Sequence, residues 1–176
     1  MAEDSSPKIV KRKKRKEVIQ VAGNPLYAPK ISPKSEIINP RTNTLDWGQF
    51  PEIITAQKTF PAGPLRLRYG EHVGPQKGYG LAHIWEARNF FHNKFNTPTL
   101  ATDAIADFLF KILEPGAEIY YEGNLATSTD KATVFKSSAG TVVVEERKDG
   151  VGNTFYSIVT AIPNNNARGT KIGTLL

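Results

Sequence analysis

The side chains of this sequence best suited to chemistry lie between residues 72 and 88: His72, Lys77, His83 and Arg88. An unperturbed histidine titrates near pH ~6.5, so at neutral pH it can both accept and donate a proton. A lysine and an arginine beside it can hold an anion against the imidazole. This combination predicts acid–base chemistry on a negatively charged substrate.

His83 is expected in the first turn of a helix that follows a glycine-rich turn and runs to about Phe91. At about 100° per residue, Leu81, Ile84 and Trp85 share one face of that helix and His83 points to the other. The apolar face can then be buried while the imidazole stays accessible. A histidine on a helix is also commonly a purely structural residue, and this alternative stays open.

Composition restricts the classes of protein to consider. The 176 residues include no cysteine and three histidines. Disulfide frameworks and thiolate metal sites are therefore excluded, and we expect neither a metal nor another cofactor. No apolar run approaches the ~18 residues of a membrane helix, and the N-terminus lacks the apolar core of a signal peptide. We accordingly expect a soluble protein with no membrane insertion.

The formal net charge of +6 favours a polyanionic partner. Part of the excess lies in the basic run at residues 11–16. Such a run fits a nucleic-acid-binding arm, a localisation signal or a solvated linker, and by itself it does not decide the chemistry.

The sequence predicts a boundary near residue 60. Prolines recur through residues 1–60, with no helical or strand period between them, which is typical of a disordered tail or one that wraps over a domain. In the wrapping case Trp47 and Phe50 would be its apolar anchors. We therefore expect a basic, proline-rich tail or linker at 1–60 and a folded domain at 61–176.

Within that domain, helices are expected to precede strands. A short strand is predicted at 65–69 and a helix from about 99 or 102 to 113, where apolar residues recur at helical spacing. Four strands are then predicted at 117–122, 132–136, 141–147 and 154–162. Short turns join these strands, as in an antiparallel meander. The predicted fold class is α+β, with N-terminal helices packed on a four-stranded antiparallel β-meander.

Two segments resemble a known family. One is Gly-Tyr-Gly-Leu-Ala-His-Ile at 78–84, followed by Arg88, and the other is Phe-Tyr-Ser-Ile-Val-Thr-Ala-Ile-Pro at 155–163. With helices before a meander, they are similar to the barnase/EndoU/colicin/RelE-like (BECR-fold) nuclease domains of bacterial toxins and phages. Many relatives have a histidine directly after the arginine, whereas this chain has Asn89. A second histidine role would then pass to His72 or to His92.

The resemblance implies a toxin ribonuclease, an endoribonuclease that cleaves RNA, with tRNA as one candidate, by metal-independent acid–base catalysis. It further implies a delivered or secreted effector of interbacterial competition that acts in the target-cell cytoplasm. A basic cleft is best blocked by opposite charge, so an acidic immunity or antitoxin protein is the expected partner.

In that chemistry, His83 would act as base or acid, with His72 as its counterpart. Lys77 and Arg88 would stabilise the charge on the phosphate, and Arg66 and Arg68 would extend the phosphate-binding surface.

Strand alternation at 154–162 places Tyr156 and Thr160 on one side, where both could reach the cleft. Both types are also good strand formers, so a structural role stays open. The weaker candidates are the carboxylates Glu86, Glu145 and Glu146 and the C-terminal cations Arg168 and Lys171.

Two other function classes remain at this point. A non-catalytic nucleic-acid-binding module would share the basic surface but would not need His83. A nucleotide-using transferase toxin, such as an ADP-ribosyl transferase, is the third class, although the glycine-rich turn lacks the strand–GxGxxG–helix context.

Overall fold

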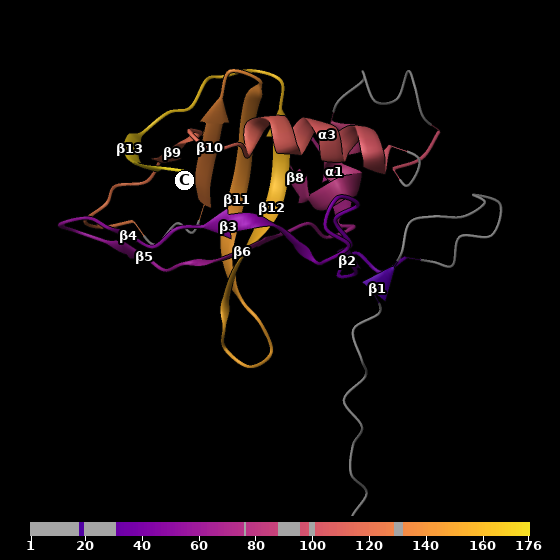
Figure 1. Cartoon of the computed structure of the whole chain (residues 1–176), viewed down its shortest axis with the longest axis horizontal. Helices are drawn as coiled ribbons and strands as arrows, with labels where there is room; N and C mark the ends of the chain where they lie inside the picture. The colour runs from indigo at the N-terminus through magenta and orange to yellow at the C-terminus, as the bar shows by residue number, and fades with distance from the viewer. Residues whose placement is uncertain (1–17, 20–30, 76, 88–95, 99–100, 129–131) are drawn as a thin grey trace, which may run out of the picture.

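A computed structural model describes residues 18–19, 31–75, 77–87, 96–98, 101–128 and 132–176 (Figure 1). Its main feature is a seven-stranded mixed sheet. In spatial order the strands are β13 (Thr170–Thr174), β9 (Glu118–Tyr121), β10 (Ala132–Ser137), β11 (Gly140–Lys148), β12 (Thr154–Ile162), β6 (Gly63–Arg66) and β3 (Asp46–Phe50).

Smaller elements flank the sheet. Three two-stranded pairs are β1 (Val18–Ile19) with β2 (Glu36–Ile37), β4 (Ile53–Ile54) with β5 (Thr59–Phe60), and β7 (Glu71–Gly74) with β8 (Lys77–Tyr79). The helices of the described chain are α1 (Gly80–Glu86) and α3 (Thr102–Ile112).

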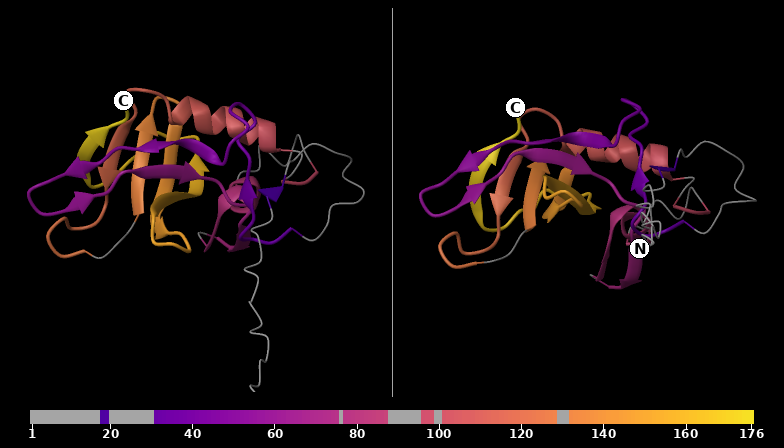
Figure 2. Two further views of the ribbon diagram at one scale, coloured as in Figure 1. Left: turned by 60° about the horizontal axis from the view of Figure 1, so that its bottom comes forward. Right: turned by 90° about the horizontal axis from the view of Figure 1, so that it is seen from below.

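The predicted α+β fold class was wrong, because the protein is mostly β. The four predicted strands are present as β9 to β12, but they form only the centre of the sheet. β13 extends it on one side, and on the other β6 joins β12 in parallel, with Leu65 opposite Tyr156, and β3 follows. Strand periodicity is local, whereas these added pairings join distant parts of the chain. Figure 2 shows that the sheet curls, with β3 and β6 crossing over its central strands.

The predicted boundary at residue 61 lies inside the folded part. Trp47 and Phe50 on β3 are only 2% and 1% exposed. The Trp47 indole donates a hydrogen bond of 3.0 Å to the Ile37 carbonyl, and Phe50 stacks on Tyr156 with ring centroids 4.0 Å apart. Of the two alternatives for residues 1–60, these contacts agree with a segment that wraps over the domain with Trp47 and Phe50 as anchors. The prolines flank β3 rather than interrupt it. The basic run at 11–16 lies outside the described residues.

The two faces of the sheet have different roles. Antiparallel partners project to the same side, so Val142 with Ala161 and Val144 with Ile158 belong to one face, which we call the core face. The buried stripe of α3 packs against this face in one apolar cluster (Ile105, Leu109, Ile112). The opposite face, here the pocket face, carries Val143 with Thr160 and Thr141 with Ile162.

Candidate functional site

The two predicted histidines are in direct contact. His72 comes from β7 and His83 from α1, and their Nδ1 atoms lie 3.1 Å apart, within hydrogen-bond distance. The rings are nearly parallel, with centroids 5.2 Å apart. His83 was expected to stay accessible, but it is only 6% exposed, and the ring of the exposed His72 stacks against it. The accessible imidazole of the pair is therefore His72.

A glycine makes this contact possible. Gly78 on β8 pairs with His72 across the hairpin and has a φ of 139°. A Cβ at Gly78 would lie 2.7 Å from the His83 Nδ1 and would also collide with the backbone oxygen of Glu71. Glycine therefore leaves the space that the His83 ring occupies.

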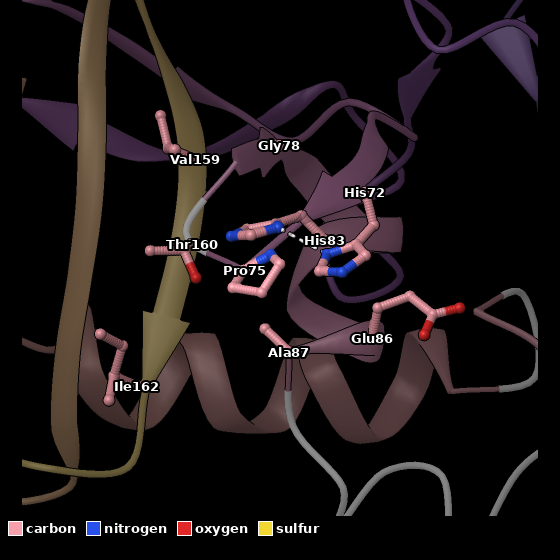
Figure 3. Close-up of a pocket in the computed structure, with 9 residues that line it drawn as sticks. All are labelled: His72, Pro75, Gly78, His83, Glu86, Ala87, Val159, Thr160 and Ile162. Carbon is pink, nitrogen blue, oxygen red and sulfur yellow. Dashed lines mark hydrogen bonds between the residues drawn. The ribbon is translucent and has the colours of Figure 1, made fainter.

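The histidine pair lies in a pocket of ≈ 500 Å³ (Figure 3). The β7–β8 hairpin and α1 form one wall, and the end of β12 forms the other. The nine lining residues are His72, Pro75, Gly78, His83, Glu86, Ala87, Val159, Thr160 and Ile162. In Figure 3 the His83 ring extends toward Thr160, so the pair is directed at β12. We call this the histidine pocket.

Thr160 supplies an unused hydrogen-bonding group in this pocket. Its Oγ1 is buried and has no hydrogen-bond partner within the described part of the chain. A buried hydroxyl without a partner costs about 1–3 kcal/mol, so a ligand that accepts or donates this hydrogen bond would recover that energy. The hydroxyl thus indicates where a polar ligand group would sit.

Tyr156 does not share the pocket with Thr160, contrary to the sequence alternation. The register of β12 against β11 shifts by one residue, because Ile158 pairs with Val144 and Thr160 pairs with Val143. Val159 is therefore the extra residue of a β-bulge, which reverses the alternation beyond it. Tyr156 consequently lies on the core face while Thr160 reaches the pocket.

The role of Tyr156 is structural. Its ring is fully buried, and its hydroxyl donates a 2.7 Å hydrogen bond to the Pro61 carbonyl. Burial, with the Glu146 carboxylate as a second cause, raises the pKa of this phenol well above its ordinary value. Tyr156 therefore remains neutral and holds the segment before β6 against β12.

The predicted cations fall into different environments. Lys77 is exposed on β8 and does not line the histidine pocket, and Arg88 lies outside the described residues, as does His92. Arg66 faces two carboxylates, at 3.4 Å from Glu36 and 3.8 Å from Asp46. The charge of Arg66 is thus compensated within the protein.

Arg68 differs from Arg66 although both guanidinium groups lie over the Phe155 ring, at 5.0 and 5.5 Å. The Nε atoms of both arginines are buried without a hydrogen-bond partner among the described residues. Arg66 faces two carboxylates, whereas Arg68 has no ion pair within the described part of the chain. Of the two arginines, Arg68 is therefore the better candidate for binding a phosphate.

The weaker candidates are mostly engaged elsewhere. Glu86 lines the histidine pocket. Glu145 forms an ion pair with Arg147 at 2.7 Å and Glu146 with Lys148 at 3.9 Å, so both act in surface ion pairs. Lys171 donates to Glu118 at 2.7 Å, and Arg168 is exposed.

Sequence reasoning missed the apolar wall of the pocket. Val159 and Ile162 line it because the bulge turns the end of β12 toward α1. A run of strand formers carries no signal for a bulge, so the sequence gives no means of finding this wall. Two absences apply to the described ranges: no group of three or more His, Cys, Asp or Glu side chains is placed to hold a metal, and no helix has the length and apolarity of a bilayer-spanning segment.

Comparison of the chain with protein-family models, curated proteins and solved structures gives no match.

Proposed function

We propose that this chain is an endoribonuclease that cleaves RNA by acid–base catalysis, with His72 and His83 as its proton-transfer groups. The observation that carries the proposal is the hydrogen bond between the Nδ1 atoms of the two imidazoles, which line a pocket open to a substrate. General acid–base catalysis requires a group that takes a proton and a group that returns one, and histidine does both near neutral pH.

The geometry of the pair suits a proton relay. In the neutral pair, one ring carries its proton on Nδ1 and donates it to the Nδ1 of the other ring. The donor ring then has a basic Nε2, and the acceptor ring carries a proton on Nε2. One outward nitrogen can therefore accept a proton while the other can release one.

RNA cleavage by this pair needs two proton transfers. His72, the exposed ring, takes the proton of the 2′-hydroxyl as that oxygen attacks phosphorus. The Nδ1 proton of His72 then shifts to His83, which releases its Nε2 proton to the departing 5′-oxygen. The P–O5′ bond breaks, a 2′,3′-cyclic phosphate remains, and the protons balance. The Thr160 hydroxyl, on the side toward which His83 extends, would donate to a non-bridging phosphate oxygen.

The proposed biological role is that of a toxin ribonuclease in competition between bacteria. Short segments at 78–84 and 155–163 resemble toxin and phage nucleases, and the net charge of +6 suits an RNA substrate. As a toxin delivered into the cytoplasm of a competing bacterium, the chain would be neutralised by an acidic immunity or antitoxin protein that covers the histidine pocket.

The decisive experiment is incubation of the purified full chain with RNA in EDTA, followed by analysis of the product ends. We expect cleavage to persist and to leave 2′,3′-cyclic phosphates. His72→Ala should reduce the rate by at least ~10²-fold without loss of folding, because its side chain is exposed. His83→Ala should be equally inactive, but it removes a buried ring, so its folding must be checked by circular dichroism.

Two controls separate this proposal from the alternatives. His92→Ala should keep its activity, and if it were inactive while His72→Ala cleaved normally, the second role would belong to His92. RNA binding without any cleavage by the folded wild-type chain would instead identify a nucleic-acid-binding module.

A further inference from the structure

A second pocket lies on the pocket face of the sheet, at the end where β10 and β12 finish. Its volume is ≈ 300 Å³, and it is lined by Gly116, Glu118, Lys136, Ser137, Ser138 and Asn165. No step of the proposed reaction uses it. Its lining combines an ammonium group and a carboxylate with hydroxyl and amide groups.

The charges around this pocket do not balance. The Glu118 carboxylate accepts a hydrogen bond from Lys171 at 2.7 Å and another from the Tyr120 hydroxyl at 2.9 Å, while Lys136 lies 3.6 Å away. The hydrogen bond from Lys171, and after it the one from Tyr120, contributes most to lowering the pKa of the Glu118 carboxyl to about 2, below its usual range. One carboxylate therefore faces two ammonium groups, and Lys136 is the more weakly engaged of the two.

Strand register places this pocket beside the histidine pocket. Glu118 pairs with Lys136, Lys136 with Thr141 and Thr141 with Ile162, so these side chains form one row on the pocket face. Ile162 lines the histidine pocket and Lys136 the second one. With ~4.8 Å between strands, the two residues are about 10 Å apart.

The loop that follows β12 also limits the distance between the two pockets. Asn165 follows Ile162 by three residues, so their Cα atoms are at most ~11 Å apart even in a fully extended chain. The loop after β12 thus joins a residue that lines one pocket to a residue that lines the other. Figure 1 shows the backbone of this loop running from β12 toward β13.

We propose that the second pocket binds a backbone phosphate of the same RNA strand whose scissile bond lies in the histidine pocket. Lys136 supplies the charge and the hydroxyl of Ser138 a hydrogen bond. This subsite rests on the proposed ribonuclease function and makes the enzyme prefer a strand that extends beyond the cleaved linkage. A dinucleotide would fill only the histidine pocket.

The test compares Lys136→Gln with Lys148→Gln, a matched change on the same sheet. Lys148 is half exposed at the far end of β11, next to the turn into β12, and also lies near a carboxylate, that of Glu146. In Lys136→Gln the Glu118 carboxylate keeps its bond to Lys171, so the fold should be unaffected. Steady-state cleavage is measured on a dinucleotide and on a longer single-stranded oligoribonucleotide.

We expect Lys136→Gln to raise KM for the long substrate roughly tenfold, with kcat and the dinucleotide kinetics unchanged. The loss of one contact to a charged group weakens binding by about that factor. The slope of log K against log salt should flatten by about 0.7 for the long strand. Lys148→Gln should change neither quantity. An equal effect on both substrates, or the same effect from Lys148→Gln, would overturn the subsite.

Binding of an all-2′-deoxy strand separates the two proposals. This strand lacks the attacking hydroxyl, so its affinity reports the subsite independently of cleavage. Weaker binding by Lys136→Gln would support the subsite even if RNA were not cut, whereas unchanged binding would refute it even if cleavage were confirmed.

Discussion

Gly78→Ala offers the sharpest test of the histidine pair because it disturbs the contact without removing either ring. The new Cβ would lie 2.7 Å from the His83 Nδ1, and ordinary contact begins at 3.4 Å, so the ring must retreat by 0.7 Å. The same Cβ would lie still closer to the Glu71 backbone oxygen, so the facing strand of the hairpin must retreat farther. The two Nδ1 atoms are now 3.1 Å apart, and beyond about 3.5 Å a hydrogen bond is lost. We therefore expect the substitution to break the relay.

The expected loss is at least ~10²-fold in kcat, the cost of a misplaced or missing acid–base group. Some destabilisation will accompany it, since alanine at a positive φ costs about 1–3 kcal/mol. Gly74→Ala controls for that strain: Gly74 lies in the same hairpin with a φ of 150°, and its added Cβ would meet nothing within 4 Å. Cleavage rates and thermal melts of the two variants are compared, with side-chain NMR of the histidines reporting the bond.

Gly74→Ala should lose stability and keep its activity, whereas Gly78→Ala should lose both. Equal activity losses in the two variants would attribute the effect to hairpin strain. Full activity in a folded Gly78→Ala protein would refute the direct bond as a requirement for catalysis.

Three further predictions follow from the geometry. The pH–rate profile should rise once to a plateau rather than form a bell, because an extra proton on the pair occupies both outward nitrogens; a falling alkaline limb due to the histidines would contradict the relay. Arg68→Gln should flatten the slope of log K against log salt for RNA binding by about 0.7 per lost phosphate contact. Arg66→Gln should instead lower the stability of the fold, because it removes a guanidinium from the buried Glu36 carboxylate. Equal salt slopes in the two variants would count against this distinction. Deleting residues 1–30 should leave a folded protein. Deleting residues 1–55 should unfold it, because the loss of the buried Trp47 and Phe50 costs ~3–5 kcal/mol each. Cooperative melting of the chain that lacks residues 1–55 would contradict this prediction.

Local patterns of the sequence predicted individual elements well. Helix α3 follows from the spacing of Ile105, Leu109 and Ile112, and strands β9 to β12 lie where turn residues and β-branched runs placed them. These features depend on neighbours along the chain, so the sequence contains their cause.

Features that depend on distant contacts could not be predicted in the same way. The parallel pairing of Leu65 with Tyr156 and the burial of Trp47 arise only when separate segments meet. The site shows the same division. His72 and His83 were identified from residue type and spacing, but the bulge at Val159, which separates Tyr156 from Thr160, leaves no mark in a run of good strand formers.

The division of the histidine pocket between two distant segments has a consequence for biosynthesis. His72 and His83 belong to one short segment, whereas the facing wall begins at Val159, which is translated 76 residues after His83. At ~5–20 residues per second, a ribosome needs roughly 4–15 s to cover that interval. A nascent chain therefore carries both histidines throughout that time but lacks the surface against which a ligand would be held. Any message truncated before the codons for β12 would encode a protein without a histidine pocket.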